Sequence, residues 1–575
     1  MEPFQNCASL RKEMSRYHQV EKDATENQVP FKIINNILIG EHSSRKYLNI
    51  GDWILITFKT RPTFIGQIDA ETGEEVTYEE MRNKSVKLAI WLQKQGIKKN
   101  DVITICINNR MRAYMPLLAG IYLNLIVNPW DCKYLEDEVR TLYFLLEHSP
   151  DVIFIDSENL TKLQTAFILT RSFDEPILSK IIVMDEPQEG LMSDKKDYDS
   201  LDSIINSKFD PSEIEAFKCA QHTERTSAVV MFSSNTSNYP GEAYIPYGLF
   251  LSHPNDETPI MKFNDVGLWY EPINWTYSLL LTIRAIISFV TAIKISTFNE
   301  ENLCQIIEKY KVSWVFLKSS MCNKFDNTNV FKKYDVSSLK QMLFGDTAII
   351  RQIHEGLIKS LPNVYITQVY GISEIGVIAY QRKTSKIGSS GYVNKNIRLM
   401  FIDYETRQPV SANTCGEIWC QAPNIIVANP QSKLLQSKYD LQRSNEGWYY
   451  TGDVGFFDED GDIFVIDKVR DLIRYRNLYI YPRKIEQILL RHPDVHEVAV
   501  VGVKHDFDRQ HAKAFVIREE GTKVTEKELI EFVKNNVDNE TYFLHGGVSF
   551  LKIMPRLPNG RIDRMRVKYV PRENE

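Results

Sequence analysis

The feature that most constrains the fold is an alternation of short β-branched runs with longer amphipathic segments along the first two thirds of the chain. Runs such as "DVITICI", "DVIFID" and "SKIIVMD" have the length and composition of buried strands. The segment "TYEEMRNKSVKLAIWLQKQG" has helical periodicity and ends with Gly96 in the helix-stop position. Strand–helix alternation of this kind predicts parallel sheets covered by helices.

The pattern changes near residue 411 to turns and short strands, as in "NTCGEIWCQAP" and "DEDGDIFVID". Further on, "VHEVAVVGVKHD" and "HAKAFVI" are typical of strands, and "RKIEQILLRH" is typical of a helix beside them. This predicts an α/β protein with a second, smaller α+β domain of about 100 residues. The first ~40 residues are polar and aperiodic, which predicts a loosely ordered extension.

Composition excludes several classes of protein. A chain of 575 residues with 43% hydrophobic content is long enough for several cores. The net charge of -6 does not favour binding to the negatively charged backbone of nucleic acid, so no nucleic-acid partner is expected. The eight cysteines lack metal-ligand spacing, and the N-terminus lacks the pattern of a signal peptide. We therefore expect reduced thiols in an intracellular protein.

Two apolar stretches, residues 114–127 and 277–293, were considered as membrane spans. Both are shorter than the ~20 uninterrupted apolar residues that cross a bilayer, so we predict buried helices and no transmembrane segment. The chain ends in "RENE", which is not a peroxisomal Ser-Lys-Leu signal.

Seven strings occur in a recognisable order between about residues 45 and 570: "GQIDAETGEEVTYEEM", "SSNTSNYPGE", "VYGISEIG", "CGEIW", "YYTGDVGFFDEDGDIFVIDKVRDLIRYRN", "YPRKIEQILLRHPDV" and "PRLPNGRIDR". Together they resemble the adenylate-forming (AMP-binding) superfamily, and within it the insect luciferase-like fatty acyl-CoA synthetases and coumarate-CoA ligases. The resemblance implies ATP, Mg²⁺ and coenzyme A, and a small-molecule carboxylic acid as substrate. It also implies a cytoplasmic or peroxisomal protein of fatty acid metabolism. Nothing in the sequence determines the oligomeric state.

The implied reaction has two steps. A carboxylic acid attacks the α-phosphate of ATP to give an acyl-adenylate, and a thiol then displaces AMP. The resemblance divides the chain into a polar extension (1–44), an AMP-binding N-terminal domain with a β-rich subdomain (45–467) and a mobile AMP-binding C-terminal domain (468–575). The two domains pivot at Asp467.

The resemblance assigns roles residue by residue. It implies nucleotide binding by Ser233, Ser234, Thr236, Ser237, Gly345, Asp346, Thr347, Tyr370, Gly371, Asp453 and Lys468. It implies catalytic roles for Ser373, Glu374 and Arg561, an acyl pocket at Trp275 and Tyr277, and coenzyme A binding at Arg474 and Asn477. Tyr370 would lie against adenine, Asp453 would accept the ribose hydroxyls, and the Glu374 carboxylate is the ligand type that Mg²⁺ prefers.

Simpler interpretations stay open for three of these motifs. "YGISE" is also consistent with a strand-to-helix turn capped by Ser373. "YYTGD" is also consistent with a Gly-Asp turn before a strand. Trp275 is also consistent with a plain core aromatic residue. No carboxylate lies between Pro272 and Ser278 to pair with an ammonium, which favours an apolar, fatty acid substrate.

Several positions depart from the family pattern. In the phosphate loop, Gly241 stands where relatives have lysine and Glu242 where they have glycine, which predicts a negative charge beside the polyphosphate. Arg561 replaces the adenylation lysine, and Lys468 replaces an arginine with a point charge.

Two departures concern space rather than charge. Asp346 adds a side chain where the backbone usually approaches the ligand, and Asn477 replaces a glycine on the thiol path. All these changes leave two hypotheses: an acyl-CoA synthetase with reduced activity, or a pseudoenzyme that binds nucleotide or acyl ligand as a sensor or partner.

Overall fold

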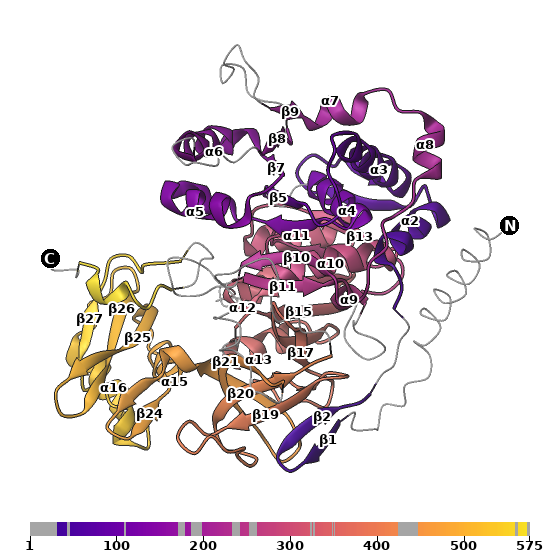
Figure 1. Cartoon of the computed structure of the whole chain (residues 1–575). Helices are drawn as coiled ribbons and strands as arrows, with labels where there is room; N and C mark the ends of the chain where they lie inside the picture. The colour runs from indigo at the N-terminus through magenta and orange to yellow at the C-terminus, as the bar shows by residue number, and fades with distance from the viewer. Residues whose placement is uncertain are drawn as a thin grey trace.

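The computed structural model describes residues 31–42, 47–108, 111–170, 179–185, 198–232, 242–251, 261–322, 325, 328–347, 349, 351–423, 447–557 and 562–571. Figure 1 shows a large body of helix-covered sheets and a smaller C-terminal unit, in yellow, beside it. The predicted α/β fold with a β-rich part and a separate C-terminal α+β unit is confirmed.

The first sheet has the order β11-β10-β6-β5-β7-β8-β9, and it is parallel except for β11. Its strands are β5 (Val102–Cys106), β6 (Ile126–Pro129), β7 (Val152–Ile155), β8 (Lys180–Val183), β9 (Asp199–Ser200), β10 (Ser227–Phe232) and β11 (Glu242–Pro246). The runs predicted as buried strands are β5, β7 and β8.

The second sheet has the order β18-β17-β16-β15-β14-β12-β13-β3-β4, with a parallel centre and antiparallel edges. Its strands are β3 (Ile65–Asp69), β4 (Glu75–Thr77), β12 (Val266–Trp269), β13 (Thr291–Lys294), β14 (Trp314–Lys318), β15 (Gln341–Gly345), β16 (Tyr365–Ile372), β17 (Gly376–Tyr380) and β18 (Tyr392–Val393).

Helices cover these two sheets. α2 (Ile50–Thr60), α3 (Tyr78–Lys94), α4 (Tyr114–Leu123) and α10 (Thr276–Ile287) share one apolar cluster with strands of both sheets. The remaining helices of this body are α5 (Glu138–His148), α6 (Ser157–Thr170), α7 (Leu201–Asn206), α8 (Pro211–Ala216), α9 (Tyr247–Leu251), α11 (Glu300–Tyr310), α12 (Ser319–Cys322) and α13 (Arg351–Ser360).

Local sequence explains α3, which confirms the helix predicted from periodicity. Thr77 and Glu80 form a capping box at its start, so two otherwise unpaired backbone N–H groups are satisfied. After its end, Gly96 adopts φ 85°, a conformation that glycine takes without a steric penalty.

The two apolar stretches begin as the predicted buried helices, α4 and α10, but each ends in a strand, β6 and β13, which the prediction of a single helix did not include. Within the described part of the chain, no helix has the length and apolar character needed to cross a bilayer. Cys106 and Cys132 lie with their sulfur atoms 3.8 Å apart as thiols, and the seven cysteines in the described part are all unbridged.

The third sheet is antiparallel, in the order β1-β2-β19-β20-β21-β22. It contains β1 (Phe31–Ile34), β2 (Ile37–Gly40), β19 (Arg398–Ile402), β20 (Gly416–Gln421), β21 (Tyr449–Phe457) and β22 (Ile463–Lys468). The prediction of an unstructured extension up to residue 44 is wrong for its last part, because residues 31–40 form the β1–β2 hairpin and β2 pairs with β19. Asn35 and Asn36 make this turn with φ of 52° and 61°, the left-handed conformation that asparagine tolerates best.

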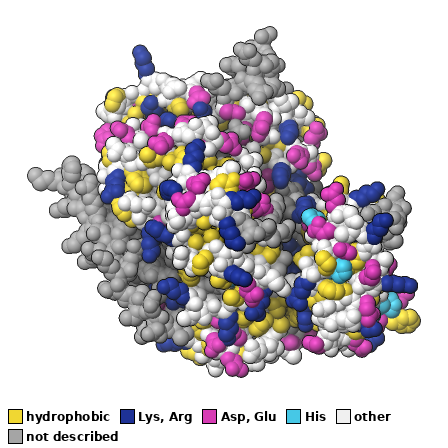
Figure 2. Space-filling view, turned by 180° about the vertical axis from the view of Figure 1, so that it is seen from behind, with side chains coloured by type: hydrophobic (Ala, Val, Ile, Leu, Met, Phe, Trp, Pro, Cys, Tyr) yellow, Lys and Arg dark blue, Asp and Glu magenta, His cyan; other side chains and the backbone are white. Residues whose placement is uncertain are grey.

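The C-terminal unit is a five-stranded sheet with two helices. Its elements are β23 (Ile473–Tyr475), β24 (Leu478–Ile480), α15 (Pro482–Leu489), β25 (Val495–His505), β26 (Arg509–Arg518), α16 (Glu526–Asn535) and β27 (Val548–Phe550). It has its own apolar cluster between the sheet and both helices. Acidic and basic side chains are interspersed over the face of the molecule seen in Figure 2.

Candidate active site

Three strands bring Tyr370, Asp453 and Lys468 together. The Tyr370 hydroxyl, on β16, donates to Oδ2 of Asp453 at 2.9 Å, although the two residues are 83 positions apart. Lys468, the register partner of Asp453 on β22, forms an ion pair with Oδ1. Asp453 is 3% exposed. A carboxylate offers about four acceptor sites. The Asp453 carboxylate can therefore still accept hydrogen bonds from the two hydroxyls of a diol beside its contacts with Tyr370 and Lys468.

Asp453 lies inside β21 and not in a turn before a strand, so the simpler interpretation of "YYTGD" is wrong. Its backbone N–H donates to Thr451 Oγ1 at 3.1 Å, which helps to fix the strand at this point. Burial and the neighbouring charge of Asp453 raise the pKa of the Tyr370 phenol, so Tyr370 acts as a donor.

Ser373 and Glu374 lie in the hairpin between β16 and β17. Ile372 pairs with Gly376, so "YGISE" is not a strand-to-helix turn and Ser373 does not cap a helix. The Ser373 hydroxyl accepts from Thr276 Oγ1 at 2.8 Å, at the start of α10. Sequence reasoning missed Thr276, although it lies one position after Trp275 in the motif already singled out.

The Glu374 carboxyl fits a cation. Desolvation raises its pKa, a hydrogen bond with Tyr449 and the charge of Lys468 lower it, and the charge of Asp453 raises it. A divalent cation beside this carboxylate would restore its ionised form, and oxygen ligands of this type suit Mg²⁺.

Gly371 is required by the packing around this hairpin. A Cβ at this position would lie 2.1 Å from the carbonyl oxygen of Gly376 and 2.5 Å from the Tyr277 hydroxyl. The Tyr277 hydroxyl is buried and has no hydrogen-bond partner among the described residues, and burial raises its pKa. A bound ligand could accept a hydrogen bond from such a group.

Trp275 and Tyr277 form an aromatic wall with Phe316 of β14. The three ring centroids lie 5.2 to 5.3 Å from one another. Lys318 lies 5.3 Å from the centre of the Trp275 ring and forms an ion pair with Glu271 at 2.6 Å. Sequence reasoning missed this pair, although Glu271 stands directly before Pro272.

Asp346 has a strained backbone at the end of β15, with φ 91°. Glycine adopts this positive φ without strain, so it would suit position 346 better than aspartate does. Gly345 must stay small for a different reason, since a Cβ there would lie 2.9 Å from the carbonyl oxygen of Val369. Ser319 of α12 donates to the carbonyl oxygens of Gly345 and Thr347, which holds this segment in place.

We expect Asp346→Gly to raise the free energy of unfolding by about 1 kcal/mol, because it removes a Cβ from a left-handed backbone. Gly345→Ala should lower it, because its Cβ has no room. Urea denaturation of both variants measures the two shifts. Equal destabilisation by both substitutions would show that the Asp346 side chain compensates for its backbone.

The residues Ser233, Ser234, Thr236, Ser237 and Arg561 lie outside the described residues. Glu242, the first residue of β11, is described and is 6% exposed. It accepts a hydrogen bond from Tyr244 and lies 3.2 Å from Nε2 of His148 on α5. The prediction that Glu242 places a negative charge beside the polyphosphate is therefore wrong, since its carboxyl is turned toward α5.

Burial raises the pKa of Glu242 to about 7 and lowers that of His148 to about 4. Above about pH 6.5 the His148 ring is neutral in both folded and unfolded chains, so of this pair only Glu242 titrates differently in the two states. The unfolded chain releases the Glu242 proton near pH 4.5. The folded chain retains it, so stability falls as the pH rises toward and through 7.

We expect the unmodified chain to lose stability relative to the Glu242→Gln variant as the pH rises from about 4.5 to 7, because only the unmodified chain has this titration. The relative loss over that range is on the order of 3 kcal/mol, at about 1.36 kcal/mol per pKa unit. Denaturant midpoints across this range measure it. An unchanged slope in the variant would refute the assignment.

Asp467 joins the large body to the C-terminal unit. Its side chain is fully buried, and its carboxylate accepts hydrogen bonds from the backbone N–H groups of Lys468 and Arg483, each at 3.0 Å.

Arg474, on β23, lies 3.9 Å from Glu405. Asn477 is exposed at the β23–β24 turn, where the positive φ, 53°, belongs to Arg476 and not to Asn477. The turn therefore does not require a glycine at position 477.

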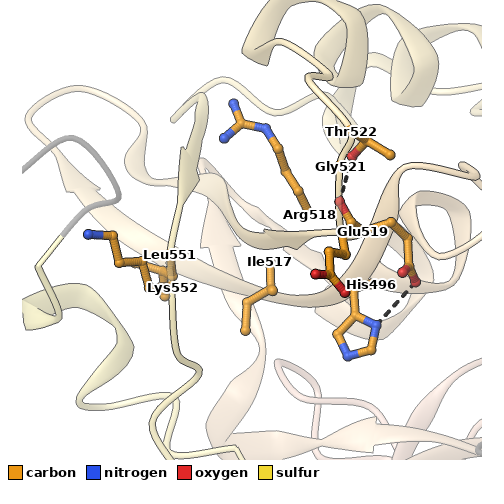
Figure 3. A pocket seen from close by; sticks show the side chains of 9 residues that line it. His496, Ile517, Arg518, Glu519, Gly521, Thr522, Leu551 and Lys552 are labelled. Atoms are coloured by element: carbon orange, nitrogen blue, oxygen red, sulfur yellow. Dashed lines mark hydrogen bonds and ion pairs between the residues drawn. The ribbon is translucent and has the colours of Figure 1, made fainter.

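A hollow of about 520 Å³ in the C-terminal unit shares no residue with this site. It is lined by His496, Glu519, Thr522 and neighbouring residues, and Figure 3 shows the His496–Glu519 pair at its edge. We assign it no role in nucleotide binding.

The fold and this cluster define a class of protein. Residues 57–427 match the family model of AMP-binding enzymes, and residues 484–561 match that of the AMP-binding enzyme C-terminal domain. The chain belongs to the family of AMP-binding enzymes, which confirms the resemblance.

Among curated proteins, the chain is similar to luciferin 4-monooxygenase of Photinus pyralis, with 26% identity over 88% of this chain and 91% of the relative. It is equally similar to 4-coumarate-CoA ligase 1 of Narcissus pseudonarcissus, with 26% identity over 89% of this chain and 91% of the relative.

Solved structures share the fold. ATP-bound MatB from Rhodopseudomonas palustris matches with TM-score 0.76 and 16% identity over 90% of this chain and 98% of that chain. The luciferase-like enzyme from the nonluminescent Zophobas morio mealworm matches with TM-score 0.65 and 22% identity over 75% of this chain and 99% of that chain.

Proposed function

We propose that the protein is an AMP-forming acid–thiol ligase that activates an apolar, fatty carboxylic acid through an acyl-adenylate and transfers the acyl group to coenzyme A. The observation that carries the proposal is the Tyr370–Asp453–Lys468 cluster, whose buried carboxylate has acceptor sites left for the two hydroxyls of a ribose, in a chain of the AMP-binding family. Relatives of this chain include coumarate-CoA ligases.

Each residue has a defined task in this proposal. Asp453 accepts the ribose hydroxyls while Lys468 and Tyr370 hold its carboxylate in place. Glu374 would hold Mg²⁺, which neutralises phosphate charge when bound. Ser373, oriented by Thr276, presents its hydroxyl to the phosphates. Asp467 is proposed as the pivot, since it holds the first turn of α15.

The proposed substrate class follows from the charges around the aromatic wall. Glu271 and Lys318 neutralise each other at 2.6 Å, which leaves no unpaired charge between them to attract an ammonium or a second carboxylate. Trp275, Tyr277 and Phe316 offer apolar faces to an acyl chain. Both observations favour an apolar acid.

A nucleotide-binding pseudoenzyme is the second candidate, favoured by Gly241 and Arg561 at the two lysine positions. Pyrophosphate exchange into ATP with a panel of fatty and aromatic acids, together with AMP calorimetry, separates the two. Exchange with a fatty acid supports the ligase. AMP binding without exchange supports the pseudoenzyme. If the chain shows no exchange and no AMP binding, both candidates are refuted.

A further inference from the structure

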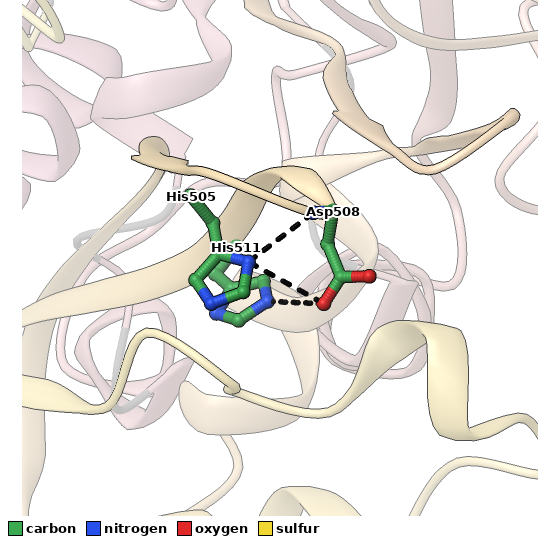
Figure 4. Close-up of side chains that lie close together, drawn as sticks. All are labelled: His505, Asp508 and His511. Atoms are coloured by element: carbon green, nitrogen blue, oxygen red, sulfur yellow. Dashed lines mark hydrogen bonds and ion pairs between the residues drawn. The ribbon is translucent and has the colours of Figure 1, made fainter.

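The end of the β25–β26 hairpin gathers three potential metal ligands. His505 ends β25, Asp508 lies in the turn and His511 follows on β26 (Figure 4). The two imidazole rings stack with their centroids 3.8 Å apart. His505 Nδ1 lies 3.5 Å and His511 Nε2 lies 2.9 Å from the same oxygen, Oδ2 of Asp508. The three potential ligand atoms therefore lie within 4.8 Å of one another, with both ring nitrogens facing the same carboxylate oxygen.

Arg476 orients the carboxylate from the other side. Its Nε lies 2.7 Å from Oδ1 of Asp508, and its backbone N–H donates to the Asp508 carbonyl oxygen at 2.9 Å. Oδ1 is thus occupied, and Oδ2 is left to face the imidazoles. A carboxylate held in place by such a hydrogen bond is a common ligand of metal ions.

The two nitrogen–oxygen separations suit a tetrahedral ion. Bonds of ~2.0 to 2.2 Å to nitrogen and oxygen place neighbouring ligand atoms about 3.3 Å apart, and the observed separations of 2.9 and 3.5 Å lie on either side of this value. The two imidazole nitrogens lie within 4.8 Å of each other, and the stacked rings would turn for both nitrogens to point at one ion. The side chains of His505 and His511 are 39% and 16% exposed, so an ion can reach them from solvent.

We propose that His505, Asp508 and His511 bind one divalent transition-metal ion of the zinc type, with water completing the coordination. Two imidazoles favour Zn²⁺, Ni²⁺ or Cu²⁺ over the hard ions Mg²⁺ and Ca²⁺, which prefer oxygen ligands. On binding, the proton on Nε2 of His511 is released to solvent or moves to Nδ1 of the same ring, so that Nε2 and the Asp508 carboxylate both face the ion. His505 Nδ1 gives up a 3.2 Å contact with the Asp508 backbone N–H. The ion would fix the β25–β26 turn, which Arg476 of the β23–β24 turn contacts through Asp508.

Calorimetry of the full chain, stripped with a chelator and titrated with Zn²⁺, tests the site. We expect one ion per chain, and His505→Gln and His511→Gln should each weaken its binding by about tenfold or more. His496→Gln is the matched control, because His496 pairs with Glu519 at 3.1 Å in the same unit.

Co²⁺ substitution identifies the ligands. The visible absorption of bound Co²⁺ should lack a thiolate charge-transfer band and should disappear in the His511→Gln variant. Absence of Zn²⁺ binding would overturn the proposal, as would equal affinity in all three variants or a thiolate band. Thermal melting of each variant shows that it is folded, and the assay does not depend on adenylation.

Discussion

Asp453→Asn is expected to weaken AMP binding by about ten- to a hundredfold. The substitution keeps the shape of the side chain but removes the charge that pairs with Lys468 and that we propose accepts the ribose hydroxyls. Hydrogen bonds to charged groups are typically worth about 1.5 to 3 kcal/mol, and 1.4 kcal/mol is about tenfold in affinity. Calorimetric titration with AMP measures the change.

Asp460→Asn is the control for this experiment. Asp460 also pairs with a lysine, Lys386, but its side chain is 68% exposed. We expect it to leave AMP affinity unchanged, because exposed ion pairs contribute little. If both variants bind AMP as tightly as the unmodified chain, the nucleotide lies elsewhere.

The double substitution Gly241→Lys with Arg561→Lys is expected to raise the rate of adenylation by about a hundredfold or more. Each restored charge acts on the developing charge of the transition state, and such preorganised groups are typically worth about 2.7 to 4 kcal/mol, at tenfold per ~1.36 kcal/mol. Pyrophosphate exchange with a fatty acid and ATP measures the gain. One lysine alone should raise the rate little, because adenylation needs both the binding of the pyrophosphate group and the activation of the carboxylate.

Glu242→Gly is the control for the double substitution, because it changes the residue next to Gly241 without restoring a lysine. Glu242 is buried against Tyr244 and His148, so its removal should lower the melting temperature without raising adenylation. An unmodified protein that already turns over at ordinary synthetase rates, with the double variant no faster, would show that Arg561 and the altered loop are a working alternative.

Local sequence predicted much of the fold. The helix α3 and the strands β5, β7 and β8 were predicted from periodicity and stop signals, and the buried helices α4 and α10 from their apolar composition. The strands β6 and β13 that follow α4 and α10 were not predicted. The β1–β2 hairpin was missed because its asparagine turn looked like one more polar stretch. Its stability comes from pairing with β19, which lies over 350 residues away in the chain.

The site was predicted less completely than the fold. The family motifs gave the positions of Tyr370, Asp453 and Lys468, and the structure brings them together. No motif indicated that Thr276 would orient Ser373, or that Lys318 would neutralise Glu271 beside Trp275. These contacts join elements that are distant in sequence, so no local pattern records them.

The sequence by itself determined which elements form and which residue types stand at the motif positions, because helices, strands and turns depend on a few neighbouring side chains. The tertiary structure alone decided what those side chains do. Glu242 has the sequence position of a charge beside phosphate, yet it is buried between Tyr244 and His148. His505, Asp508 and His511 become a cluster only because the hairpin folds back on itself. Burial and charge pairing depend on partners that only the folded chain brings within reach.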